Sequence, residues 1–166
     1  MITRIVVWSR KEIEENPTDK FSHIISIIDP KKPLHVEGRN VSQHIFHDIE
    51  QPMDGATVPT KQDVQNIIDF LKNAHDHEDE VSLLIHCTAG ISRSTASALI
   101  GFYLVHKDEK KAFANLLHTS RSCWPNLLML KYADEILETN FLKIVGQWKY
   151  DVRTYGEQKA NYKIFN

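Results

Sequence analysis

A cysteine and an arginine stand at the two ends of one short segment, Cys87 and Arg93, with five residues between them. A cysteine that ionises to a thiolate is a strong nucleophile, and the planar fork of an arginine can bind two oxygens of one phosphate group. His86 precedes the cysteine, Gly90 lies between the pair, and Ser94 follows the arginine. These residue types at this spacing indicate transfer of a phosphoryl group through a cysteine.

The residues on either side of this segment predict the elements that hold it. The apolar run 81–85 predicts a buried strand, and the small residues of 94–100 predict a closely packed helix. A loop between a strand and a helix directs free backbone amides and the positive end of the helix dipole toward one point. We therefore expect an anion site there, in which Cys87 is ionised near neutral pH.

Residues 86–94 read His-Cys-Thr-Ala-Gly-Ile-Ser-Arg-Ser and fill every fixed position of the pattern His-Cys-x-x-Gly-x-x-Arg-Ser. This segment resembles the signature of the cysteine-dependent protein tyrosine phosphatases. Its residues Ala-Gly-Ile-Ser-Arg-Ser are similar to those of the dual-specificity branch and of small bacterial members. The resemblance implies that Cys87 is the nucleophile, that Arg93 holds two phosphate oxygens and that Ser94 helps the sulfur to leave. It also implies that His86 orients the loop and helps to keep Cys87 ionised. The backbone amides expected to bind phosphate are those of Thr88, Ala89, Gly90, Ile91, Ser92 and Arg93.

The alternative, non-catalytic role for Cys87 is that of a buried structural thiol, which is the usual role of a lone cysteine. Its neighbours in the signature favour catalysis instead. The second cysteine, Cys123, lies in the segment 120–126, which is similar to the Arg…Pro-Asn segment of dual-specificity members. That similarity implies that Pro125 and Asn126 support the signature loop from behind. Cys123 is expected to be a core thiol, with a resolving role toward oxidised Cys87 as the alternative.

The leaving oxygen of a phosphate ester needs a proton, so an acid must stand opposite the thiolate. Two aspartates compete for this role, Asp54 and Asp48, which lie 33 and 39 residues before Cys87. The segment around Asp54, residues 52–59, is similar to the acid loop of several branches of the family, and its spacing also suits them. We therefore predict Asp54 as the general acid and Asp48 as a loop anchor or second acid. Either aspartate could instead only cap a turn beside Gly or Pro.

Apolar runs and helical periodicities alternate along the chain. Residues 2–8, 23–28, 41–47 and 81–85 predict strands, and a capping box at Thr60 and Asp63 begins a predicted helix. Further helices are expected at about 92–106, 108–118 and beyond Pro125. This order predicts an α/β fold with a central, mostly parallel sheet of four to five strands and helices on both faces, similar to that of the tyrosine phosphatases.

The composition fits one domain of an ordinary globular protein. The chain has 166 residues, of which 42% are hydrophobic and 25% charged, and a net charge of −2. This charge argues against a nucleic-acid or membrane-surface binder. Two cysteines make no disulfide framework, so a cytoplasmic, reducing setting is expected. We predict a monomeric phosphatase domain over residues 1–145 and a tail over 146–166 whose structure the pattern does not predict.

The resemblance implies a protein phosphatase that hydrolyses phosphotyrosine through a phosphocysteine, with phosphoserine and phosphothreonine as further possible substrates. It implies no cofactor and no metal, and a phosphorylated protein as the partner. Two alternatives stay open. One is a module that docks phosphorylated partners without turnover, and the other is a phosphatase of a non-protein phosphate ester. The second is disfavoured because the signature loop carries no lysine to bind a highly charged ring phosphate.

Overall fold

The computed structural model describes residues 1–166 and has one sheet at its centre. Its four strands are hydrogen-bonded in the order β1-β4-β2-β3, and every pair is parallel. The predicted α/β class is confirmed, with a sheet that is parallel throughout. The strands are β1 (Ile2–Trp8), β2 (His23–Ile28), β3 (Asn40–Ile45) and β4 (Val81–His86).

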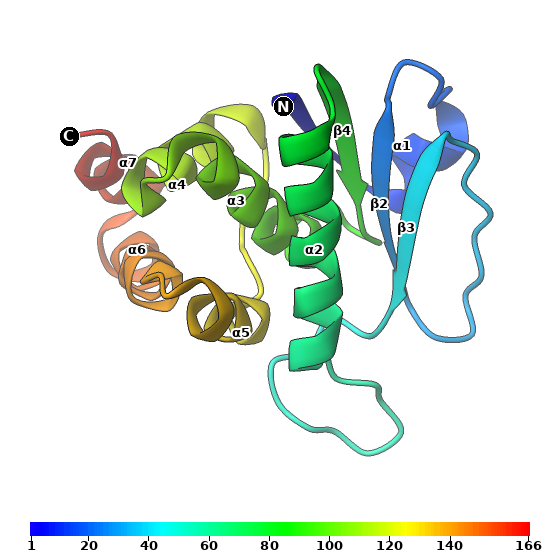
Figure 1. Cartoon of the computed structure of the whole chain (residues 1–166). Helices are drawn as coiled ribbons and strands as arrows, with labels where there is room; N and C mark the ends of the chain where they lie inside the picture. Colours follow the sequence, from blue (N-terminus) through cyan, green and yellow to red (C-terminus); the bar gives the residue numbers. More distant parts are fainter.

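Seven helices surround this sheet unequally (Figure 1). The first helix lies on one face, and the others lie on the opposite side or extend away from it. The helices are α1 (Arg10–Glu15), α2 (Lys61–His77), α3 (Arg93–His106), α4 (Glu109–Thr119), α5 (Leu127–Leu137), α6 (Phe141–Tyr155) and α7 (Glu157–Phe165). Helices on both faces were expected, but the two layers differ greatly in size. No helix is both long and apolar enough to cross a bilayer.

The two central strands are the most apolar because both of their faces are covered. All six residues of β2 are buried, and so are five of the six in β4. The larger core lies between the sheet and α2–α7, and a smaller cluster of Ile13, Phe21, Ile24 and Leu84 lies under α1. In a parallel sheet all strands end at the same edge, so the segments after β1, β2, β3 and β4 gather there.

The helix α2 shows how local sequence sets an element and its orientation. Thr60 and Asp63 form the predicted reciprocal capping box, which satisfies backbone amides at the helix start. The predicted apolar stripe is fully buried against the sheet, α3 and α5, and consists of Val64, Ile67, Ile68, Leu71 and Ala74. The helix therefore closes the side of the sheet that carries β3.

The last elements differ from the sequence expectation in detail. Helix α5 begins after Pro125, with Asn126 as its N-cap, and it buries Met129, Leu130 and Ala133 most deeply. Leu128, Tyr132, Ile136 and Leu137, the predicted inner side, are only partly buried, because α5 packs between α2, α3 and α6. Residues 146–166 form the end of α6 and the whole of α7. Trp148 and Ala160 from this stretch lie in the main core.

Candidate active site

The signature loop, residues 87–92, joins the end of β4 to the start of α3. Gly90 has φ +71°, and a Cβ there would lie 2.8 Å from the backbone nitrogen of Ser9 and 2.9 Å from the carbonyl of Trp8. Only glycine allows this backbone shape and this close approach to the β1–α1 junction. The amide of Arg10 also donates to the Thr88 carbonyl, at 3.0 Å. The loop is therefore held against the neighbouring strand end.

The Cys87 sulfur lies at the bottom of this loop, and the residue is only 2% exposed. The Gly90 amide donates to Sγ at 3.3 Å, and the Ser94 hydroxyl lies 3.1 Å from Sγ. In the contact with Ser94 either the hydroxyl or the thiol can be the donor. The two predicted residues Cys87 and Ser94 are thus in direct contact.

The Arg93 side chain is buried, at 2% exposure, beside the same loop. Its Nη1 donates to Asp29 Oδ1 at 2.7 Å and to the Phe46 carbonyl at 2.6 Å, and its Nη2 donates to Thr88 Oγ1 at 3.1 Å. Its Nε is buried and has no hydrogen-bond partner. A buried donor without a partner is rare and costly, and an anion that reached Nε would satisfy it.

Asp29, directly after β2, is a site residue that sequence reasoning missed. One carboxylate oxygen accepts from Arg93 and the other accepts from the Thr88 hydroxyl, at 3.1 Å. Burial alone would raise the pKa of Asp29, but the charge and hydrogen bonds of Arg93 lower it below its ordinary value. The signal for Asp29 was its place at the end of a predicted strand, where polar side chains meet the catalytic loop.

Asp48 lies next to the signature loop. Its Oδ1 accepts from the Ser92 hydroxyl at 2.7 Å and from the Asn126 side-chain amide at 3.0 Å. The structure therefore joins Asp48 to both the signature loop and the start of α5. These contacts suit a loop anchor, and they also hold a carboxylate beside the signature loop.

Asp54 lies at the tip of the connection between β3 and α2, in a turn closed by the Ala56 amide and the Met53 carbonyl at 3.1 Å. The residue is exposed, and its carboxylate has no hydrogen bond or ion pair within the chain. The base of this connection is closed by backbone and ring contacts between His47 and Thr57. The connection projects below the carboxyl edge of the sheet (Figure 1).

His86 is fully buried behind the loop. Its Nε2 lies 2.7 Å from the Ser26 hydroxyl on β2, and its Nδ1 lies 3.3 Å from the Cys87 carbonyl. Burial lowers the pKa of His86 to about 4, so the ring is neutral at pH 7. His86 consequently acts on the loop through hydrogen bonds and supplies no positive charge to the sulfur.

The segment before α5 lies against the signature loop. The Trp124 amide donates to the Ile91 carbonyl at 2.9 Å, and the Asn126 amide donates to the Ser92 carbonyl at 3.2 Å. Cys123, beside this segment, is partly buried, and burial raises the pKa of its thiol to about 12. Such a thiol is a poor nucleophile at neutral pH, as expected of a core cysteine.

Comparison with known proteins agrees with this geometry. The family model described as protein-tyrosine phosphatase matches residues 14–129. The fold is similar to human DUSP28, with a TM-score of 0.59 and 14% identity over 82% of this chain and 95% of that one. It is also similar to Tk-PTP in the active form, with a TM-score of 0.52 and 13% identity over 72% of this chain and 80% of that one. No curated protein matches the chain by sequence.

The family match covers more than half of the chain and includes β2, β3, β4 and the whole signature loop. The two solved structures share the fold of this chain. The match and the geometry of the loop lead to the same result. This chain belongs to the protein-tyrosine phosphatase family.

Proposed function

We propose that this protein hydrolyses phosphotyrosine in protein substrates through a phosphocysteine at Cys87. The main observation behind the proposal is the set of groups gathered at the signature loop. The Cys87 sulfur contacts the Gly90 amide and the Ser94 hydroxyl, and Arg93 is buried beside the loop with no partner for its Nε. A nucleophile and an anion clamp around one point are what phosphoryl transfer to a side chain needs.

In the first step the Cys87 thiolate attacks phosphorus, the S–P bond forms, and the bond between phosphorus and the tyrosine oxygen breaks. Arg93 and the amides of the signature loop stabilise the charge on the three equatorial oxygens. An aspartic acid gives its proton to the leaving phenolate. Asp29 does not take this role, because both of its oxygens accept hydrogen bonds from Arg93 and Thr88.

In the second step water attacks phosphorus, the S–P bond breaks, and inorganic phosphate leaves. The aspartate that gave its proton now takes one from the water. The Ser94 hydroxyl, 3.1 Å from Sγ, can donate to the sulfur as it regains negative charge. The sulfur thereby becomes a better leaving group without a metal or a cofactor in the sequence of steps.

The position of the general acid is part of the proposal. Asp54 is the choice that the loop sequence favours, whereas Asp48 is the aspartate in contact with the signature loop through Ser92. We propose that the connection between β3 and α2 supplies the acid, and the contact favours Asp48. Asp48→Asn and Asp54→Asn separate the two. The variant that lacks the acid should lose about 100-fold or more in kcat and the basic limb of its pH profile.

The family supports phosphotyrosine as the substrate, because the matching model is that of the protein-tyrosine phosphatases. Cys87 is only 2% exposed, so the phosphate must enter the signature loop to reach the sulfur. A thiolate of this kind also needs a reducing compartment, such as the cytoplasm, to stay active. Rates with matched phosphotyrosine and phosphoserine peptides test the preference.

The main experiment measures phosphate release from a phosphotyrosine peptide in the presence of a chelator. Wild-type protein should turn over, and Cys87→Ser should lose at least about 10⁴-fold in kcat while still binding phosphate. Cys123→Ser is the matched control and should retain full activity. If wild-type protein bound the peptide without releasing phosphate, it would be a docking module. An active Cys87→Ser would exclude the phosphocysteine.

A further inference from the structure

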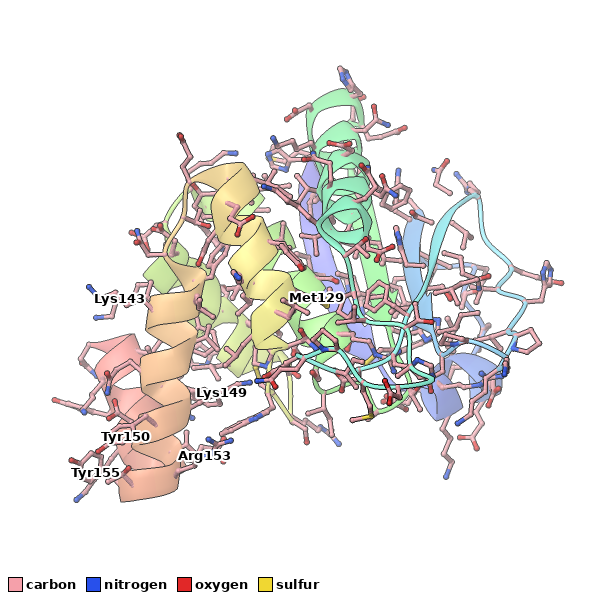
Figure 2. The ribbon with its side chains drawn as sticks, turned by 90° about the horizontal axis from the view of Figure 1, so that it is seen from below. Met129, Lys143, Lys149, Tyr150, Arg153 and Tyr155 are labelled. Carbon is pink, nitrogen blue, oxygen red and sulfur yellow. The ribbon has the colours of Figure 1, made fainter.

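Lys149 is a buried lysine outside the signature, on the inner face of α6, and it is only 4% exposed. Its Nζ donates to the Pro125 carbonyl at 2.6 Å, lies 4.8 Å from the centre of the Trp124 ring, and is 3.9 Å from a carboxylate oxygen of Glu50. Figure 2 shows this side chain directed from α6 toward the loops, whereas Lys143 and Tyr150 lie farther from them.

The first group of partners connects Lys149 to the signature loop. Pro125 lies between Trp124 and Asn126, whose backbone amides donate to the carbonyls of Ile91 and Ser92 at 2.9 and 3.2 Å. The ammonium group therefore holds the middle residue of a three-residue segment whose two ends bind the loop. A shift of the Pro125 carbonyl would move both of these hydrogen bonds.

The second group connects Lys149 to the segment that follows β3. The carboxylate of Glu50 faces Nζ, and the same oxygen accepts from the Leu127 amide at 2.9 Å. Asn126 binds the Asp48 carboxylate at 3.0 Å and the Ile49 carbonyl at 3.2 Å. The ammonium group of Lys149 and the side chain of Asn126 together hold residues 48–50 against the start of α5.

A structural role alone explains this lysine poorly. A buried ammonium group loses its hydration, and an apolar side chain of similar volume commonly stabilises a core as well or better. A buried lysine is better explained if it sets the distance between the segment after β3 and the signature loop, which must act together. The segments that it joins carry the anion-binding loop and the proposed acid.

We propose that Lys149 is a positioning residue that holds the acid-bearing connection, residues 46–60, in register with the signature loop. The inference rests on the proposed function, because it assumes that this connection supplies the proton. Its effect should appear in proton donation to the leaving group. Phosphate binding should change little, because Arg93 is held by Asp29 and Phe46, and the signature loop is also held at the β1–α1 junction by the Arg10 amide.

The test compares substrates that differ only in the need of the leaving oxygen for a proton. We expect Lys149→Met to lower kcat/KM, which reports the first step alone, about 10-fold for phenyl phosphate and for a phosphotyrosine peptide. For a dinitrophenyl phosphate, whose phenolate leaves without a proton, kcat/KM should fall less than about 2-fold. Inhibition by inorganic phosphate should also change less than about 2-fold. An equal loss with all leaving groups, or weaker phosphate binding, would overturn the proposal.

Lys163→Met is the matched control. Lys163 also forms an ion pair with α6, to Asp151 at 3.0 Å, but it has no contact with either loop. Lys163→Met should leave the ratio of kcat/KM for phenyl phosphate to kcat/KM for dinitrophenyl phosphate unchanged. Glu50→Ala is a second variant in case Lys149→Met fails to fold, because Glu50 is exposed. It should show the same leaving-group dependence in smaller measure, and an unchanged ratio there would contradict the inference.

A double variant tests whether Lys149 acts through the general acid. When the acid has been replaced by Asn, the further change Lys149→Met should have almost no effect on phenyl phosphate, because the group that it positions is gone. Independent, multiplying losses would show that Lys149 acts elsewhere. If wild-type protein hydrolyses none of these esters, it is the proposed function that fails.

Discussion

Arg93 and Asp29 form an ion pair, with 2.7 Å between Nη1 and Oδ1, in which the arginine side chain is 3% exposed and the aspartate side chain 15%. The two residues are 64 positions apart in the chain and meet because β2 and β4 are parallel neighbours. The pair leaves Nε of Arg93 without a partner. The carboxylate therefore orients the guanidinium and leaves one of its donors for an anion.

Asp29→Asn tests this orienting role. The amide keeps the shape but loses the charge that faces Arg93, so the guanidinium is held less firmly. We expect kcat/KM to fall about 10- to 100-fold, because misplacement of a binding group by a fraction of an ångström is costly. Inhibition by inorganic phosphate should weaken in parallel. Lys32→Met, which removes only an exposed lysine 3.9 Å from the same carboxylate, should change neither quantity.

Gly90→Ala tests the contact between the signature loop and the β1–α1 junction. The new Cβ would lie 2.8 to 2.9 Å from backbone atoms of Ser9 and Trp8 at φ +71°, so the loop must shift. We expect a destabilisation of about 1–3 kcal/mol and a large loss of activity. Gly55→Ala is the control, because Gly55 has φ +73° with no atom near its Cβ. It carries the dihedral strain without the clash and should keep most of the activity.

Ser94→Ala tests the hydroxyl beside the sulfur. Without this donor the thiolate is a poorer leaving group, so breakdown of the phosphocysteine should slow about 100-fold. Rapid-quench measurements with a phosphotyrosine peptide should then show a burst of product followed by a slow steady state. Ser97→Ala provides the comparison, because Ser97 is a buried serine of the same helix that donates only to the Arg93 carbonyl. A burst in both variants, or in neither, would argue against the role of Ser94.

His86 predicts a specific dependence of stability on pH. Its folded-state pKa is lowered from 6.5 to about 4 by burial, so between these values the unfolded chain binds a proton that the folded chain does not. Stability should therefore be lost as pH falls from 6.5 to 4, by up to about 3 kcal/mol from this residue, and be fully present above 6.5. Denaturant unfolding of wild-type protein and His86→Asn at pH 7 and pH 4.5 measures the difference. The variant should show a clearly smaller fall.

Cys87 predicts a selective reaction with iodoacetate. The Gly90 amide and the Ser94 hydroxyl both face its sulfur, and Cys123 lies in surroundings that oppose ionisation. At about pH 8 the proposed nucleophile Cys87 should be alkylated and Cys123 should not, because burial raises the pKa of the Cys123 thiol to about 12. Mass spectrometry of the digested protein identifies the site. Equal labelling of both cysteines, or labelling of Cys123 alone, would contradict the assignment of Cys87 as the reactive thiol.

The parts of this protein that sequence predicted are those that depend on neighbours in the chain. The strand before Cys87, the helix after it and the capping box of Thr60 are set by residues a few positions apart, so their types and spacing are enough. The same holds for the sharp turn at Gly90, where the residue type and the signature agree with a positive φ. The signature also placed Cys87 and Ser94 together, because the loop is too short to separate them.

Only the tertiary structure decided what stands opposite the loop. Asp29 against Arg93, Asp48 against Ser92 and Lys149 against Pro125 are contacts between segments that meet through the order of parallel strands and the packing of α6. The local pattern of residues 146–166 did not predict that α6 would contact the segment before α5 through Lys149. Chemistry carried by a single short loop can be predicted from sequence, whereas partners brought together by packing over long chain separations depend on the whole core.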